Sequence, residues 1–186
     1  MATHDTKLGI GLATGMFYHA PAGTALPTDP TATIPSTWEK VGDVSIDGLS
    51  LTFDKTTTDL RNMANVVKRT IMTEHAESVQ ATIMDTTEES LKAVLGASNV
   101  TVTAATTTHG KQITAALSQS TLPSEEAYLF VMKDDDDMMM LGTSKGQIDS
   151  MDAITFAPGE SINWKPTIKG LDAGWKIIMD DGQTTS

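Results

Sequence analysis

Residues 41–96 constrain the fold most, because they combine a long period-2 strand pattern with a capped helix. Over residues 44–53, apolar side chains stand at every second position, which is typical of a strand. They occupy the even positions at Val44 and Ile46 and the odd positions at Leu49, Leu51 and Phe53. A strand whose pattern changes phase holds one extra residue. We therefore predict one long strand with a bulge at Asp47-Gly48, because a hairpin turn there would leave very short arms.

Residues 54–69 follow this strand. Most of this stretch has no regular spacing of apolar residues, and it contains few apolar β-branched side chains. This pattern predicts a long polar loop between two strands. Strand character returns over residues 66–84, where the two faces alternate: Val79, Ala81 and Ile83 on one, Ser78, Gln80 and Thr82 on the other. We expect one face of this strand to be buried and the other to be solvated.

A capping sequence, Thr86-Thr87-Glu88-Glu89, follows the second strand. The Thr86 hydroxyl can accept a hydrogen bond from the Glu89 amide, while the Glu89 carboxylate accepts one from the Thr86 amide. Leucine and valine residues then form an apolar stripe, and Gly96 suits a helix C-cap. The pattern predicts one short α-helix over about residues 86–95.

The rest of the chain alternates strand patterns with turns. We predict a hairpin over residues 100–117, a strand at 127–132 covered on both faces, a hairpin with an acidic tip at Asp134 to Asp137, a loop at 142–146, and strands at 151–156, 161–168 and 175–179. The fold class is mainly β, a β-sandwich or partly closed barrel with one short α-helix.

Four prolines lie between residues 20 and 37: Pro21, Pro27, Pro30 and Pro35. They predict extended backbone, because proline suits neither a helix interior nor a central strand. Trp38 follows these prolines and should pack against another surface, because a side chain of its size is rarely left exposed. The alternative is that the segment is a flexible tail. We predict an N-terminal arm and first strand over residues 1–40, a β-rich domain over 41–179 and a C-terminal tail over 180–186.

Composition excludes several functions. The 186 residues contain no cysteine, so neither a disulfide framework nor thiolate chemistry is available. The formal net charge of -11 argues against a surface that binds nucleic acid, which needs clustered Lys and Arg. No apolar run reaches the roughly 20 residues of a membrane span, and the first residues do not read as a signal peptide.

No catalytic, cofactor or metal site is predicted. The four histidines are scattered and none are spaced as ligands on one helical face: His4, His19, His75 and His109. The acidic run at 134–137 fails the calcium-loop pattern, because Met139 stands where that loop needs glycine and Lys145 where it needs a bidentate glutamate. The sequence also lacks a glycine-rich phosphate loop and a nucleophile elbow. We expect no enzymatic activity.

A family resemblance rests on the order of motifs in the central region: Gly42-Asp43-Val44, Asp47-Gly48, a Thr-Thr-Asp-Leu-Arg run at 57–61, and Val67-Lys68-Arg69-Thr70. This order resembles the major tail tube protein of long-tailed, non-contractile bacteriophages, over roughly residues 15–170. The resemblance implies rings of six subunits that stack into a tube and pass DNA without binding it specifically. Implied partners are further copies of the chain and the tape measure, tail-tip and tail-terminator proteins. The implied location is the virion tail, after synthesis in the host cytoplasm.

Three sets of residues would then contact other molecules. The loop would reach the next ring through Asp59, Leu60, Arg61, Met63, Val66, Val67, Lys68 and Arg69. Acids flanking the loop would line the lumen or else solvate an outer face: Asp43, Asp47, Glu74 and Glu77. The arm would lie on a neighbouring subunit through Pro21, Pro27, Pro30, Pro35 and Trp38.

Two questions stay open at the level of sequence. The acidic surface that receives the basic loop could be the Asp134 to Asp137 tip or the Glu88-Glu89 end of the helix. A monomeric β-sandwich that serves as a binding or adhesion module is the alternative function, because the same strand count would suit it.

Overall fold

A computed structural model describes residues 9–11, 16–118, 122–134, 136–172 and 174–181. In chain order, its elements are β1 (Ile10–Gly11), β2 (Phe17–Pro21), β3 (Glu39–Gly42), β4 (Val44–Arg61), β5 (Val67–Ile83), α1 (Glu88–Leu95), a 3-10 turn (Ala97–Asn99), β6 (Val100–Thr103), β7 (Gln112–Ala115), β8 (Glu126–Asp134), β9 (Asp137–Met151), β10 (Pro166–Gly170) and β11 (Lys176–Asp180). Nine strands make one sheet in the order β3-β2-β8-β9-β10-β5-β4, with β1 beside β8 and β11 beside β9. β6 and β7 form a separate antiparallel hairpin, as predicted.

The main sheet bends round until its two edges meet. β3 and β4 are the opposite ends of the strand order, yet only Asp43 separates them in the chain. Because one residue spans less than about 4 Å, the edges must come together at this point. The Asp43 carbonyl also accepts a hydrogen bond from the amide of Met84, just beyond β5. The prediction of a mainly β fold with one short helix is confirmed. Of the two predicted architectures, a sandwich or a partly closed barrel, the meeting of the sheet edges favours the barrel.

Alternate side chains of β8 lie in two apolar layers. Tyr128 and Phe130 belong to the main core, to which α1 also contributes, and Phe17 of β2 stacks on Phe130 with ring centroids 4.5 Å apart. Leu129 and Val131 belong to a second core, on the opposite face of the strand because side chains alternate. The predicted burial of this strand on both faces is confirmed.

The proline-rich segment between β2 and β3 covers the second core within its own chain. Leu26 and Ile34 pack against the cluster that contains Trp38, which is only 5% exposed. The N–H of Gly23 donates a 2.8 Å hydrogen bond to the carbonyl of Ser144 in β9. These contacts exclude the alternative that this segment is a flexible tail.

The N-cap of helix α1 lies one residue later in the sequence than predicted. Thr87, not Thr86, is the N-cap: its hydroxyl accepts from the N–H of Ser90, and the Ser90 hydroxyl accepts from the N–H of Thr87. Thr86 instead accepts a hydrogen bond from the Trp164 indole. The N–H of Gly96 closes the helix on the carbonyl of Lys92, so the predicted C-cap is confirmed. Within the described residues, no helix is long and apolar enough to cross a membrane.

The long loop predicted over residues 54–69 is wrong. β4 continues to Arg61 and β5 begins at Val67, and the two strands pair along nearly their whole length. Threonines 56–58 are β-branched and suit an exposed strand although they are polar, so the absence of apolar alternation did not mean a loop. The predicted bulge is confirmed, because the register shifts between Val44 and Leu49.

Smaller corrections lie in the C-terminal half. Residues 142–146, predicted as a loop, run inside β9; a glycine inside a strand often marks a close approach, and a Cβ at Gly142 would stand 2.7 Å from Leu26. Residues 152–156 are not a strand. Residues 161–165 are not one either, apart from a single bridge between Trp164 and Ile83. The acidic hairpin joining β8 to β9 is confirmed.

Candidate assembly surfaces

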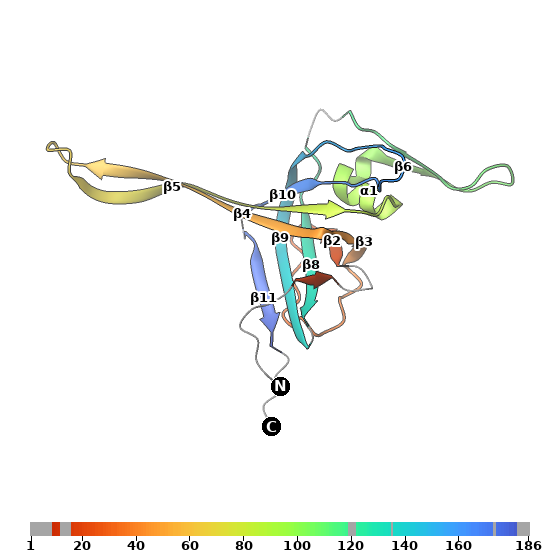
Figure 1. Cartoon of the computed structure of the whole chain (residues 1–186), viewed down its shortest axis with the longest axis horizontal. Helices are drawn as coiled ribbons and strands as arrows, with labels where there is room; N and C mark the ends of the chain where they lie inside the picture. Colours follow the sequence, from red (N-terminus) through yellow and green to blue (C-terminus); the bar gives the residue numbers. More distant parts are fainter. Residues whose placement is uncertain (1–8, 12–15, 119–121, 135, 173, 182–186) are drawn as a thin grey trace, which may run out of the picture.

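Two arms project from the body of the molecule on opposite sides (Figure 1). The outer parts of β4 and β5 form the longer arm, and the chain around β6 and β7 forms the other. Nearly every residue from Thr52 to Ala76 is exposed, so this part of the β4–β5 hairpin adds little to the core of its own subunit. An ordered strand pair held away from its own core is a candidate contact surface.

The tip of the β4–β5 hairpin is fixed by Asn62. Its N–H donates to the carbonyl of Val66 at 3.0 Å, and its side-chain Oδ1 accepts from the N–H groups of Ala64 and Val66 at 3.1 and 2.9 Å. Asn65 adopts a positive φ of 59°, a conformation that asparagine tolerates better than most residues. This turn chemistry was the sequence signal for a hairpin in place of a loop.

The charges of the hairpin divide into paired and unpaired groups. Arg61 forms a 3.0 Å ion pair with Asp59, and Asp59 also accepts from the Thr70 hydroxyl at 2.8 Å. Lys68 and Arg69 are exposed and form no ion pair with the described residues. Of the three cations predicted to give the hairpin its positive charge, Lys68 and Arg69 are therefore unpaired and Arg61 is neutralised by Asp59.

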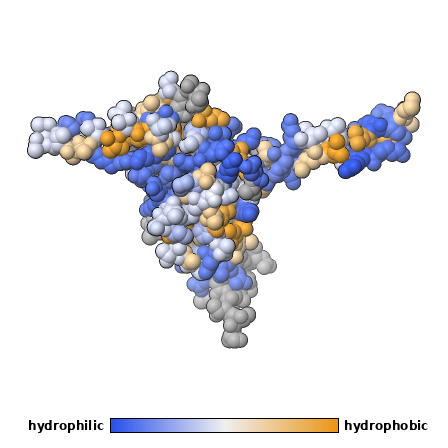
Figure 2. All heavy atoms as spheres, turned by 180° about the vertical axis from the view of Figure 1, so that it is seen from behind, coloured by the Kyte–Doolittle hydropathy of each residue, from blue (hydrophilic) through white to orange (hydrophobic). Residues whose placement is uncertain are grey.

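Large apolar side chains are exposed along the same hairpin. Met63 at the tip is fully exposed, and Leu60 and Val66 beside it are about half exposed, as are Phe53 and Met72 farther along. Figure 2 shows orange stretches among the hydrophilic surface of this hairpin. Clustered exposed apolar side chains on a soluble chain mark interaction sites.

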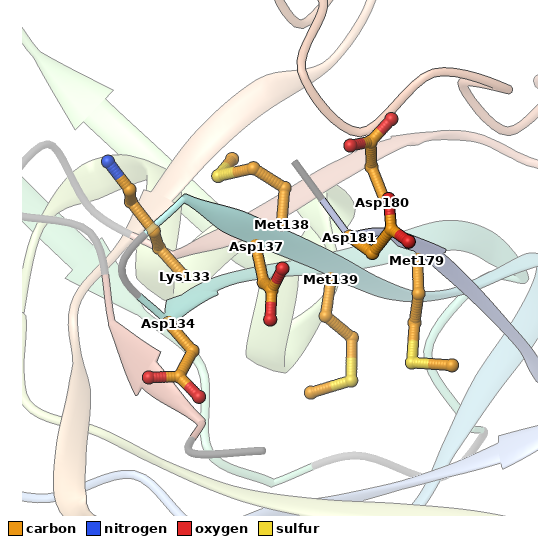
Figure 3. Close-up of a pocket in the computed structure, with 8 residues that line it drawn as sticks. All are labelled: Lys133, Asp134, Asp137, Met138, Met139, Met179, Asp180 and Asp181. Carbon is orange, nitrogen blue, oxygen red and sulfur yellow. The ribbon is translucent and has the colours of Figure 1, made fainter. Parts of the chain in front are cut away.

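An acidic, methionine-lined hollow of about 390 Å³ lies where the β8–β9 hairpin meets the end of β11. Figure 3 shows its lining: Lys133, Asp134, Asp137, Met138, Met139, Met179, Asp180 and Asp181. Met139 and Met179 are paired across β9 and β11 and point to the same side of these strands. Four carboxylates against one ammonium make the rim of this acidic pocket negative.

The sequence alone indicated only the part of the acidic pocket that the β8–β9 hairpin contributes. The Asp134 to Asp137 run and the neighbouring methionines were visible as a hairpin tip. Met179 and Asp180 join them because β11 pairs with β9 over residues 138–142. No local pattern in the sequence indicates which strand β11 would pair with, so the part that β11 contributes could not be found.

The four lumen candidates are not brought together on one face. Glu74 and Glu77 lie three residues apart in a regular stretch of β5, so they point to opposite sides. Glu77 also has a role within the subunit, since its carboxylate accepts from the N–H of Trp175 at 2.7 Å and lies 3.1 Å from His75. Asp43 lies at the meeting point of the sheet edges, and Asp47 contacts Ser45 at the bulge.

The residues of the N-terminal, proline-rich segment do not all face outward, as contact with a neighbouring subunit would require. Trp38 and Pro30 are buried against their own chain, and Pro27 is half-buried. Pro21 and Pro35 are exposed. Only the outer surface of this proline-rich segment is therefore available to a neighbouring subunit.

The described residues bring three potential metal ligands together, although the sequence predicted none. His19, Glu39 and Glu89 each place one ligand atom within 4.8 Å of the others. They come from β2, β3 and the first turn of α1. Their spacing in the sequence gives no signal, because the contact depends on the pairing of β2 with β3 and on where the helix lies.

The fold thus defines a β-rich protein whose most prominent surfaces are projecting hairpins. The sequence matches the model of the phage tail tube protein family over residues 1–180. The chain belongs to this family, so it is a structural, non-enzymatic component of a phage tail. No curated protein matches the chain at the level of sequence. Among solved structures, it is similar to the tube-terminating cap of the anti-feeding prophage, at 10% identity over 95% of each chain, with a TM-score of 0.44.

Proposed function

We propose that this protein is the repeating subunit of a non-contractile tail tube, in which rings of six subunits stack and guide DNA into the host. Family membership and the projecting β4–β5 hairpin support the proposal. The hairpin carries exposed apolar side chains and, near its tip, the unpaired cations Lys68 and Arg69, in a chain whose formal net charge is -11. Identical subunits that stack head to tail need two different surfaces that fit each other.

The hairpin tip is the proposed inter-ring contact. Leu60, Met63 and Val66 would supply apolar contact, and Lys68 and Arg69 would supply charge, with Val67 and the Asp59–Arg61 pair alongside. The acidic pocket of a subunit in the next ring suits this tip in two ways. Its methionines can adapt to apolar side chains, and its four carboxylates complement the two cations.

The other acidic surface considered for this role is less suitable. Glu88 already bonds to Lys111 and Lys92, and these bonds hold the pKa of the Glu88 carboxyl below its usual value. An incoming cation would have to replace two existing cationic partners there. We assign the receiving surface to the acidic pocket because its methionines also offer an adaptable apolar contact to the hairpin tip.

The acidic composition also suits the passage of DNA, because a wall without clustered cations would not grip the phosphates. Asp43, Asp47 and Glu74 remain lumen candidates, whereas Glu77 is better explained by its contacts within the subunit. Tape measure, tail-tip and tail-terminator proteins are the expected partners inside and at the ends of the tube.

The experiment is a charge swap between the two surfaces. Changing Lys68 and Arg69 to Glu should leave the circular dichroism spectrum unchanged and abolish tubes in negative-stain micrographs. Adding Asp134→Lys and Asp137→Lys to this variant should restore tubes. The control exchanges Val102 and Ile113 of the other projecting hairpin for Ser, which should leave stacking intact.

Two outcomes would count against the proposal. Tubes of normal length from the Lys68→Glu/Arg69→Glu variant would remove the hairpin from the inter-ring contact. A wild-type protein that stays monomeric at high concentration, even with a tail-tip complex present as a nucleus, would favour the monomeric binding module instead.

A further inference from the structure

His19 is a buried histidine with one ring nitrogen left without a hydrogen-bond partner. The residue is 8% exposed, and its Nε2 atom is buried and unpartnered. The pairing of β2 with β3 places Glu39 directly opposite His19. The Glu39 Oε2 atom lies 3.6 Å from Nε2, too far for a good hydrogen bond.

The other ring nitrogen is firmly held. Nδ1 lies 2.7 Å from Oε2 of Glu126, whose side chain is 15% exposed. Because an ionised carboxylate can only accept a hydrogen bond, Nδ1 carries the proton. With the proton on Nδ1, the lone pair of Nε2 is directed away from Glu126, on the side where Glu39 lies 3.6 Å away. A carboxylate that orients a histidine in this way is the usual outer contact of a zinc ligand.

Glu89 completes the cluster from the first turn of α1. One ligand atom from each of His19, Glu39 and Glu89 lies within 4.8 Å of the others. Tetrahedral zinc with bonds of about 2.1 Å holds its ligand atoms about 3.4 Å apart, which is close to the separation of Nε2 and Glu39. Because Glu39 is exposed, its side chain can adjust to close the remaining distance to Glu89.

We propose that His19, Glu39 and Glu89 bind one Zn²⁺ ion, with Glu126 as the positioning residue behind His19. One imidazole and two carboxylates suit zinc, and three protein ligands leave a fourth position for water. The ion would tie α1 to the β2–β3 edge of the sheet. Lys92 is the nearby competitor, because its ammonium lies 3.9 Å from Glu89, but its stronger contact is with Glu88.

The test is zinc titration of the intact chain after dialysis against a chelator. Isothermal titration calorimetry should give one Zn²⁺ per chain. At a hundredfold excess over Kd, the Tm should rise by about 5–10 °C. Mg²⁺ should give no such rise, because it prefers ligand sets made only of oxygen.

Variants assign the ligands. His19→Gln should abolish binding, and Glu126→Gln should weaken it about 10–100-fold. Glu39→Gln should also abolish tight binding, and it changes an exposed side chain that the fold does not need. His109→Gln is the matched control, since His109 is exposed and its ring lies within hydrogen-bond distance of the neighbouring Gly110 carbonyl.

Two results would overturn the proposal. The absence of zinc binding to the folded wild type would mean that His19 serves only as a structural contact of Glu126. Equal binding by folded Glu39→Gln and by the wild type would place the zinc elsewhere, for example at the acidic pocket.

Discussion

Asp85 holds the two edges of the sheet together at Asp43: its Oδ2 atom accepts a 2.7 Å hydrogen bond from the backbone N–H of Asp43. The same carboxylate lies against Gly42, the last residue of β3, where a Cβ would stand only 2.4 Å from Oδ2. Gly42 also has a φ of 152°, a conformation that residues with a Cβ rarely adopt. The closure of the barrel therefore depends on a glycine and a carboxylate that pack directly on each other.

Gly42→Ala should destabilise the subunit by about 2–3 kcal/mol, from backbone strain and overpacking combined. Gly48→Ala is the control, because Gly48 also has a positive φ but a Cβ there meets nothing within 4 Å; it should cost about 1 kcal/mol. Urea unfolding measures both. In a double-mutant cycle, Asp85→Ala should recover part of the Gly42→Ala loss, because it removes the Oδ2 and Cγ atoms at 2.4 and 3.0 Å and leaves only the Asp85 Cβ, at 2.8 Å, in close contact. Strict additivity would show that the two residues do not interact.

Glu77 should matter for stability and Glu74 should not. The Glu77 carboxylate holds the N–H of Trp175 and contacts His75 while partly buried, whereas Glu74 is exposed and makes one long 3.4 Å contact with Thr56. Loss of a charge-assisted hydrogen bond predicts a cost of about 1.5–3 kcal/mol for Glu77→Ala. Glu74→Ala should stay within about 0.5 kcal/mol of wild type. Equal effects in chemical denaturation would contradict this assignment.

The β4–β5 hairpin shows how far the sequence alone could predict this fold. Leu49, Leu51 and Val79 are partly or fully buried, and there the period-2 pattern identified both strands correctly. Beyond them the strands leave the body of the subunit, so neither face is buried and no apolar alternation is required. The turn residues Asn62 and Asn65 were the remaining signal for where the hairpin ends.

The candidate sites were harder to predict than the fold, because their residues meet through strand pairing. The acidic pocket needs β11 beside β9, and the His19 cluster needs β2, β3 and α1 together. Periodicity shows that a strand exists and which of its faces is apolar, but not which strand lies next to it. Trp38 could be predicted as buried because its size alone requires a packing partner.

Alkaline pH should destabilise the protein through Tyr128. Burial raises the pKa of the Tyr128 hydroxyl far above its usual value. The folded state therefore keeps a proton that the unfolded state releases above about pH 10. The stabilisation is complete below that pH and is lost as pH rises above it.

Thermal unfolding followed between pH 8 and about pH 11 tests this expectation. Tyr128→Phe has no proton to lose and should show a weaker fall in Tm above about pH 10. Tyr18→Phe, in the neighbouring strand β2 and only half-buried, is the matched control and should follow the wild type. Identical profiles for wild type and Tyr128→Phe would assign alkaline unfolding to other groups.

The proline-rich segment between β2 and β3 should be required for folding as well as for assembly. Leu26, Ile34 and Trp38 cover the second core, so deletion of residues 22–35 would expose apolar side chains of β8 and β9. Trp38→Ala should cost about 3–5 kcal/mol, the usual range for a buried aromatic. Pro35→Ala, at an exposed position of the same segment, should change stability by less than about 0.5 kcal/mol.

Urea unfolding of the single variants, with sedimentation of the deletion variant, separates the two roles of this segment. A deletion variant with wild-type stability that fails only to assemble would show that the segment acts solely between subunits. We expect instead a lower unfolding midpoint and increased aggregation, because the uncovered face of the sheet would be free to associate non-specifically.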